Sequence, residues 1–311
     1  MANQPDHKRI QLEDLEKTWN FKASPRFKSQ FEQLDLSYTE ISETQRDEAI
    51  LSFIDTLQGD LVKAGPHRMV DWEHGWRENH NSFLESSDIS DILPKYFGKI
   101  PLVRWQRNWI LPTDERMEYN MLGLILEYLI EKYLSSEDKV YEFGCGTGHN
   151  LLRIRKHHKN MTLFGLDWAE SSQNLIEIIA NQTNDQNLKA DNFDYFNPNL
   201  GLKLPENSVV LTVASLEQTG SDFKEFIDYL VTEKPRLVIH VEPMWEPLDS
   251  THLLDSLSIK YFQKRNYLNG LLKYVEELES RNLVKIIDVQ RTFVGSFFIE
   301  GYSILVWSPL H

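Results

Sequence analysis

Three glycines at alternate positions, Gly144, Gly146 and Gly148, follow a short apolar run at 140–143. This run has the composition of a buried strand, and residues 149–157 have apolar residues at helical spacing. Glycines let a backbone approach a ligand closely, and the first N–H groups of a helix are free to bind one. The strand, turn and helix therefore predict one half of a nucleotide-binding fold.

The spacing of the glycines separates this loop from two other phosphate-binding loops. A dinucleotide fingerprint, G-x-G-x-x-G, requires glycine at position 149, where the sequence has His149. A P-loop requires lysine at the start of the helix, and no lysine follows Gly148. The pattern that remains is Glu142, two positions before the first glycine, followed by G-x-G-x-G.

This pattern resembles the first motif of the class I S-adenosylmethionine (SAM) dependent methyltransferases. The resemblance implies that the loop formed by Gly144, Cys145, Gly146 and Gly148 passes under the methionine part of SAM. It also implies that Glu142 helps to hold the ammonium group of SAM.

A second acidic position supports the same ligand. The apolar run 161–166 ends at Asp167, and a carboxylate at the end of a second strand can accept hydrogen bonds from both ribose hydroxyls. The alternative is that Asp167 caps a helix ahead of Glu170. Together with the glycine loop, the position favours ribose binding.

The adenine contacts are predicted from the end of the next strand, 188–191. Asp191 resembles the third acidic position of the family, and Asn192 and Phe193 supply backbone and ring contacts. Trp168 would flank the other face of the adenine. The alternative for Asp191 is an ordinary loop or turn acid.

Two further cofactor contacts are predicted. The segment 113–133 is predicted to be a helix with Thr113 as its cap. In the family that the sequence resembles, a residue of this helix often reaches the SAM carboxylate. Tyr119 is the candidate for this contact. The alternative is that Tyr119 is a partly buried surface tyrosine. Ser215 follows the predicted strand 208–214 at the carboxyl edge of the sheet, where open α/β sheets bind ligands.

The resemblance implies methyl transfer to oxygen, nitrogen or sulfur, and an alcohol acceptor requires a base. Glu217, His240 and Glu242 are the candidates, because they lie at the ends of the fourth and fifth predicted strands. His240 has the most suitable unperturbed pKa, although a histidine within an apolar strand is more often a core residue. No Asp…Asp-Asn pattern stands at the expected strand ends, so no metal is expected.

Composition limits the partners and the compartment. The 311 residues are 41% hydrophobic and carry a formal net charge of −14, which disfavours nucleic acid and anionic membranes as partners. Cys145 is the single cysteine, so no internal disulfide can form, and a small turn residue is a better interpretation of it than a nucleophile. Residues 1–20 lack the apolar segment of a signal peptide, and no apolar run is long enough to span a bilayer. A cytoplasmic enzyme is expected.

The chain divides into two predicted parts. Residues 1–112 are a mainly helical, aromatic-rich extension that either packs on the core or forms a lid over the SAM site. Residues 113–311 alternate strands and helices, which indicates an α/β fold with helices on both faces of a mostly parallel sheet. The resemblance implies a seven-stranded Rossmann-like sheet of order 3-2-1-4-5-7-6, with the last strand antiparallel and joined directly to the sixth.

The predicted function is transfer of the SAM methyl group to a small or medium polar acceptor, with S-adenosylhomocysteine (SAH) as product. A hydroxyl of a saccharide or specialised metabolite is favoured as acceptor. The alternatives are a protein, peptide or amine nitrogen acceptor, and a non-catalytic SAM-binding partner protein. A homodimer is possible.

Overall fold

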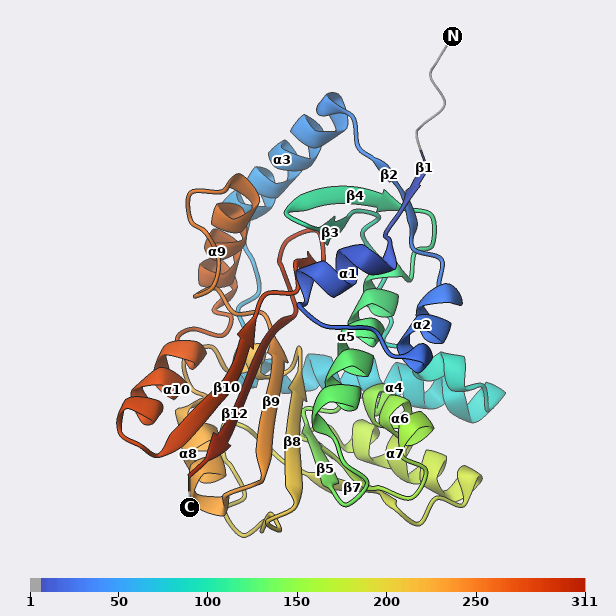
Figure 1. Cartoon of the computed structure of the whole chain (residues 1–311), viewed down its shortest axis with the longest axis vertical. Coiled ribbons are helices and arrows are strands. Elements are labelled where there is room, and N and C mark those ends of the chain that lie inside the picture. Colours follow the sequence, from blue (N-terminus) through green and yellow to red (C-terminus); the bar gives the residue numbers. More distant parts are fainter. Residues whose placement is uncertain (1–6, 311) are drawn as a thin grey trace.

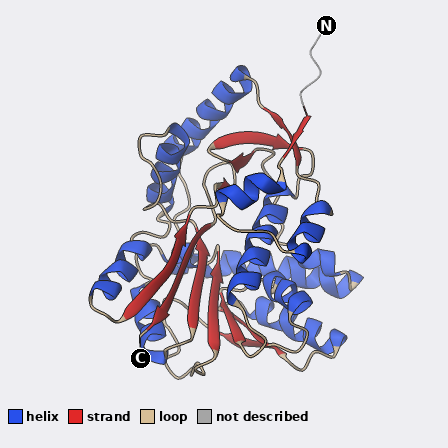
Figure 2. Cartoon of the chain, viewed as in Figure 1, coloured by secondary structure: helices blue, strands red, loops and turns tan. Residues whose placement is uncertain are grey.

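The structure is a computed structural model that describes residues 7–310, and it contains a seven-stranded and a five-stranded sheet (Figures 1 and 2). The strands of the large sheet are β5 (Lys139–Phe143), β6 (Thr162–Asp167), β7 (Leu188–Asn192), β8 (Ser208–Val213), β9 (Leu237–Glu242), β10 (Val284–Gln290) and β12 (Ser303–Pro309). The helices that cover it are α5 (Met117–Tyr133), α6 (His149–His157), α7 (Glu170–Thr183), α8 (Lys224–Glu233) and α10 (Leu271–Ser280).

The order of the large sheet is β7-β6-β5-β8-β9-β12-β10. Numbered along the chain, this order is 3-2-1-4-5-7-6, as predicted. Strands β5 to β9 pair in parallel, whereas β12 pairs antiparallel with both β9 and β10. The predicted sheet is therefore confirmed, and β5, β6 and β8 lie next to one another, so that their carboxyl ends meet at one edge.

Alternating side chains of the central strands enter two different apolar cores. On β9, Ile239 and Val241 pack in the core that includes α5, α6 and α7. Val238 packs in the opposite core with α8 and α10. This alternation is typical of a sheet that is buried on both faces, and it confirms that helices cover both sides.

The N-terminal part differs from the prediction because it contains a sheet as well as helices. Its helices are α1 (Leu12–Thr18), α2 (Pro25–Glu32), α3 (Glu43–Gln58) and α4 (Met69–Ser86). Four short strands, β1 (His7–Arg9), β2 (Ser37–Glu40), β3 (Val103–Trp105) and β4 (Asn108–Pro112), form an antiparallel sheet in the order β1-β2-β4-β3. Strands of three to five residues carry too little alternation to be recognised in the sequence.

The fifth strand of this sheet comes from the C-terminal part. β11 (Val294–Gly295) lies between β10 and β12 in the chain and pairs with β3. The predicted direct connection between the last two strands is therefore wrong, and β12 begins at Ser303 rather than at residue 297. Pairing across the parts joins residues 7–112 to the rest of the chain.

Helix α5 begins later than predicted. Its first residue is Met117, and Thr113 lies in the preceding turn. The Asp114 carboxylate accepts a hydrogen bond from the backbone N–H of Arg116, which stabilises a local turn in competition with the helix. Helix α3 begins after Ser42, whose hydroxyl accepts a hydrogen bond from the N–H of Gln45. No helix among residues 7–310 is long and apolar enough to cross a membrane.

Arg104 on β3 links the small sheet to α9 (Leu253–Arg265) and to the chain before β12. Its buried guanidinium donates to the carbonyls of Leu254, Phe297 and Phe298, at 3.0, 3.3 and 3.1 Å, and to the hydroxyl of Ser258 at 2.6 Å. Burial lowers its pKa to about 10. Hydrogen bonds to three carbonyls satisfy most of its five donors.

We expect Arg104→Met to destabilise the protein by about 3 kcal/mol, because the substitution leaves several buried carbonyls without a donor. Urea unfolding followed by circular dichroism would measure the change. Arg46→Met, at an exposed position of α3, is the control and should change the free energy of unfolding by less than about 0.5 kcal/mol. Equal effects of the two substitutions would contradict this role of Arg104.

Candidate functional site

The loop between β5 and α6 has the tight geometry that its glycines predict. Gly144 and Gly146 have φ of 66° and 53°, a region that side chains other than glycine rarely adopt. A Cβ atom added at Gly144 would lie 2.5 Å from Cβ of Ser215, and one added at Gly146 would lie 2.8 Å from Cζ2 of Trp76. Glycine is therefore required at both positions by conformation and by space.

Asp167, at the end of β6, holds this loop against the neighbouring strand. One carboxylate oxygen accepts from the N–H of Gly146 at 2.9 Å, and the other accepts from the N–H of Ala169 at 2.9 Å. Burial is the main reason that its pKa is raised to about 6. The same side chain lines a cavity, so it positions the loop and also faces a ligand space.

Glu142 is buried beneath the loop, with 1% of its surface exposed. One carboxyl oxygen accepts from Nδ2 of Asn150 at 2.8 Å, and the other has no hydrogen-bond partner. Burial raises its pKa to about 8. An unpaired buried acceptor suits a cationic group, but Glu142 lines neither of the cavities next to the loop, and its contact to an ammonium group stays a prediction.

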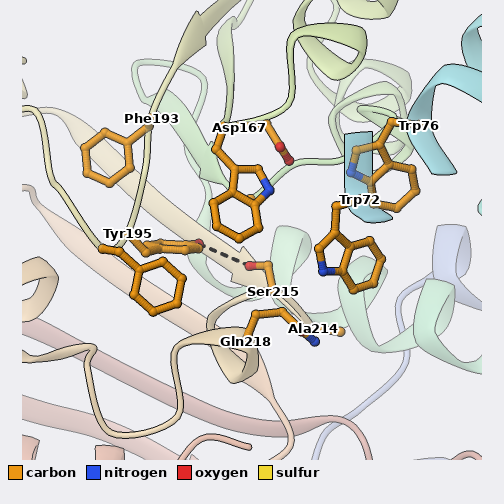
Figure 3. A pocket seen from close by; sticks show the side chains of 11 residues that line it. Trp72, Trp76, Asp167, Phe193, Tyr195, Ala214, Ser215 and Gln218 are labelled. Atoms are coloured by element: carbon orange, nitrogen blue, oxygen red, sulfur yellow. Dashed lines mark hydrogen bonds between the residues drawn. The ribbon is translucent and has the colours of Figure 1, made fainter. Parts of the chain in front are cut away.

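A mainly aromatic cavity opens on one side of the loop (Figure 3). Trp168 and Phe196 stack with ring centroids 5.9 Å apart. The hydroxyl of Tyr195 hydrogen-bonds that of Ser215 at 3.1 Å. The lining consists of Trp72, Trp76, Gly144, Asp167, Trp168, Phe193, Tyr195, Phe196, Ala214, Ser215 and Gln218. Aromatic walls of this kind suit a flat heteroaromatic ring.

A larger and more polar cavity lies next to it and shares Trp72, Trp76, Gly144, Ala214 and Gln218. Several polar atoms of its lining residues are buried and without a hydrogen-bond partner. The acceptors are Oδ1 of Asn150, Oε2 of Glu217 and Oε1 of Gln218. The nitrogens are Nε1 of Trp72, Nε2 of His149 and Nε of Arg265. Buried polar groups are normally hydrogen-bonded, so this concentration marks a place where a polar ligand fits.

His149 is neutral at this site. Its Nδ1 lies 3.0 Å from the hydroxyl of Thr147. Burial, followed by the positive charge of Arg153, lowers the pKa of the imidazole to about 3. The ring can therefore donate or accept a hydrogen bond through Nε2 without adding a charge.

Five of the residues predicted to bind the cofactor line neither cavity: Tyr119, Glu142, Gly148, Asp191 and Asn192. Tyr119 contacts Phe97 and His149 and lies under the guanidinium of Arg153, and it faces a different groove. Asp191 and Asn192 are exposed, and Asn192 donates to the backbone carbonyl of Trp168. Asp191 and Asn192 are exposed because they end β7, which is the edge strand of the large sheet.

The three predicted bases have different surroundings. Glu217 lines the large cavity. His240 and Glu242 are fully buried within the sheet and line neither cavity. Burial lowers the pKa of His240 to about 3. The geometry therefore favours Glu217 over the other two.

The carboxylate of Glu242 is used in hydrogen bonds within the fold. Its carboxylate accepts from the backbone N–H groups of Ser215, Leu216 and Glu217 at 3.1–3.3 Å. These groups begin the short 3₁₀ helix η3 (Leu216–Thr219). Since its oxygens are occupied, Glu242 positions Glu217 rather than facing a ligand.

Sequence reasoning missed several lining residues. Trp72 and Trp76 of α4 stack with ring centroids 5.5 Å apart, and Trp76 packs against Gly146. The clustering of aromatic residues in this segment was the available signal. Glu118, one residue before Tyr119, lines the large cavity. No sequence motif marks Tyr195 as a lining residue, because its hydrogen bond with Ser215 depends on the path of the chain after β7.

Two further points concern the single cysteine, Cys145, and the side chains that could bind a metal. Cys145 is a buried free cysteine, and burial raises the pKa of its thiol well above the ordinary value. Among residues 7–310, no group of three or more His, Cys, Asp or Glu side chains is arranged to hold a metal ion.

The sheet order, the glycine loop after its first strand and the acid at the end of its second define the class I, Rossmann-like methyltransferase fold. No protein-family model matches the chain, and no curated protein matches it.

Solved structures with similar folds were found at low identity. One is magnesium protoporphyrin IX methyltransferase from Synechocystis PCC 6803 with bound SAH, at 14% identity and a TM-score of 0.45, covering 61% of this chain and 82% of that chain. Another is a SAM-dependent methyltransferase from Aquifex aeolicus, at 12% identity and a TM-score of 0.41, covering 60% and 89%. A third is geranyl diphosphate methyltransferase with geranyl diphosphate and sinefungin, at 10% identity and a TM-score of 0.42, covering 64% and 83%.

The raised pKa of Glu142 predicts how the free energy of unfolding changes with pH. Because its folded-state pKa of about 8 exceeds the ordinary value of 4.5, folding favours the protonated form, and stability falls as pH rises from 4.5 to 8. We expect Glu142→Gln to remove this dependence. Relative to the parent chain, the variant should gain up to about 1.4 kcal/mol per pH unit between pH 5.5 and 7.5.

Urea unfolding of both proteins at pH 5.5, 6.5 and 7.5 would measure this difference. The exposed substitution Glu177→Gln is the matched control. A constant difference between Glu142→Gln and the parent across this range would show that Glu142 is ionised in the folded protein.

Proposed function

We propose that this protein transfers the methyl group of SAM to a small-molecule acceptor. The observation that carries the proposal is the juxtaposition of the Gly144–Gly148 loop, Asp167 and buried polar atoms without partners in one pair of connected cavities. SAM has an aromatic base, a ribose, and a methionine part with an ammonium, a carboxylate and a sulfonium. Each of these parts has a chemically suitable group in the site.

The aromatic cavity suits the adenosine part of SAM. Trp168 and Phe196 offer ring faces, and Asp167 offers a carboxylate at the cavity wall for ribose hydroxyls. Phe193 and Ser215 line the same cavity, as expected for two of the predicted cofactor contacts.

The methionine part has suitable partners beneath and beside the glycine loop. Glu142 and Asn150 provide unpaired acceptors for an ammonium group. His149 and Trp72 provide ring nitrogens for a carboxylate. Burial of several carboxyl groups makes the interior favourable for the net positive charge of SAM.

The large cavity is the proposed acceptor site, and Glu217 is the proposed proton acceptor. Burial, followed by the negative charge of Glu242, raises the pKa of Glu217 well above its ordinary value. A cation next to this carboxyl would lower that pKa again and release the base form. SAM supplies an activated methyl group, so the protein's own tasks are to align the acceptor, exclude water and take up one proton.

We infer a small-molecule acceptor for this cavity, whose walls come from α4, from β8 and from residues next to β12. The hydroxyl acceptor predicted from the sequence and an amine acceptor both fit a site with one base. A non-catalytic SAM-binding protein would share the cofactor contacts, and measurable methylation of an acceptor would separate it from an enzyme.

We expect calorimetric titration to show binding of SAM and of SAH with dissociation constants in the micromolar range. Asp167→Asn should weaken the binding of SAM and of SAH by about tenfold or more, because the carboxylate holds the loop and faces the proposed ribose site. Asp222→Asn, at an exposed loop position, is the control and should bind like the parent. Thermal melting would verify that each variant is folded, and failure of the folded parent to bind either ligand would refute the proposed function.

A further inference from the structure

The lining of the large cavity includes two carboxyl and two phenol groups that lie in different parts of the chain. Glu118 lies in the first turn of α5, and its carboxylate accepts a hydrogen bond from the hydroxyl of Tyr302 at 2.8 Å. Glu217 follows β8, and Tyr96 precedes α5 in the chain. All four side chains line the same cavity.

The two carboxyl groups have no basic partner. No ion pair within residues 7–310 involves Glu118 or Glu217. Glu217 is 8% exposed, and one of its oxygens has no hydrogen-bond partner. Its neighbour Gln218 is 7% exposed and has an unpaired side-chain carbonyl. These buried acceptors lie in the wall of a cavity large enough for a ligand.

The cations around the cavity are mostly engaged elsewhere. Arg68 pairs with Asp71 at 2.8 Å. Lys95 is exposed and donates to the hydroxyl of Ser82. Lys99 is exposed at the mouth of the cavity. None of these three cations forms an ion pair with Glu118 or Glu217.

Arg265 also lines the cavity, and its positive charge acts to lower the pKa of Glu217. Its guanidinium donates to the backbone carbonyl of Val62 and to the hydroxyl of Tyr267. It pairs with neither carboxylate, so Glu118 and Glu217 are left for a ligand.

Aromatic rings complete this region. Trp72, Trp76, Tyr96, Tyr267 and Tyr302 all line the cavity. Tryptophan and tyrosine faces attract cations, including alkylated ammonium groups, and they do so most strongly where water is excluded. The combination of unpaired carboxyls with such rings favours a positive ligand over a neutral alcohol.

We propose that the methyl acceptor is a primary or secondary amine of a small molecule, held as a cation by Glu118 and Glu217 among the aromatic side chains of the large cavity. This inference rests on the proposed methyltransferase function and names its substrate class. It replaces the hydroxyl predicted from the sequence, because a bound cation interacts favourably with both carboxyls and with the aromatic faces, whereas a neutral alcohol does not.

The chemistry balances with groups that are present. The bound ammonium first gives one proton to the Glu217 carboxylate and becomes a neutral amine. The nitrogen lone pair then forms the new N–C bond, while the electron pair of the broken C–S bond stays on sulfur. The products are an N-methylated ammonium, which carries the positive charge formerly on sulfur, and neutral thioether sulfur in SAH.

A matched pair of probes tests this proposal without turnover. Choline and 3,3-dimethylbutan-1-ol have nearly the same shape, but only choline is charged. We expect calorimetry on the full chain saturated with SAH to give at least about tenfold tighter binding of choline. Glu118→Gln and Glu217→Gln should each reduce this preference to about threefold or less. Glu85→Gln, at an exposed position of α4 outside the cavity, should leave it unchanged.

The outcomes separate this proposal from the one on which it rests. If SAH itself does not bind, the proposed methyltransferase function fails. If SAH binds and the two probes bind equally, or if the neutral probe binds more tightly, the amine proposal is wrong. The comparison on the parent chain decides this even if a variant does not fold.

Discussion

The site depends on one buried carboxylate, that of Asp167. Burying a carboxylate is costly unless hydrogen bonds compensate for the lost water, and here the backbone N–H groups of Gly146 and Ala169 provide them. The bond to Gly146 ties the loop after β5 to the end of β6. Because this loop forms part of the wall of both cavities, their shape follows from this contact and from the parallel pairing of the two strands.

The N-terminal part contributes to the site because α4 is anchored on the core. Glu73 of α4 accepts from the backbone N–H of Ser171 at 3.2 Å, and the Ser171 hydroxyl donates to the Glu73 carbonyl at 3.1 Å. These bonds hold the part of α4 that carries Trp72 and Trp76. Trp76 packs against Gly146, and both tryptophans line the aromatic cavity (Figure 3). Pairing of β11 with β3 and the hydrogen bonds of Arg104 add further links. Residues 7–112 are thus joined to the remainder of the chain at several points, and they supply walls of both cavities.

Several acidic side chains around the site have pKa values that burial raises. Glu118, Glu142 and Asp167 have pKa values raised to about 7, 8 and 6, with burial as the largest cause in each case. Groups held partly neutral in this way respond strongly to a nearby charge, since a bound cation restores their ionised form. Burial of acids around a cavity therefore costs stability in the ligand-free protein and favours cationic ligands.

The sequence by itself determined the sheet and the loop. The composition of residues 139–143 and 162–167 predicts two strands, and the glycines from Gly144 to Gly148 predict a tight turn between the first strand and its helix. These signals can be read from the sequence because each depends only on residues that are close together in the chain. The sequence did not reveal which polar residues face the ligand. Tyr119 and Glu118 differ by one position on a helix, yet only Glu118 lines the large cavity. His240 and Glu242 lie inside the sheet, whereas Glu217 reaches the cavity. Tertiary structure decided these points because the direction of a side chain depends on helix rotation, strand pairing and the docking of α4, which involve residues far apart in the chain.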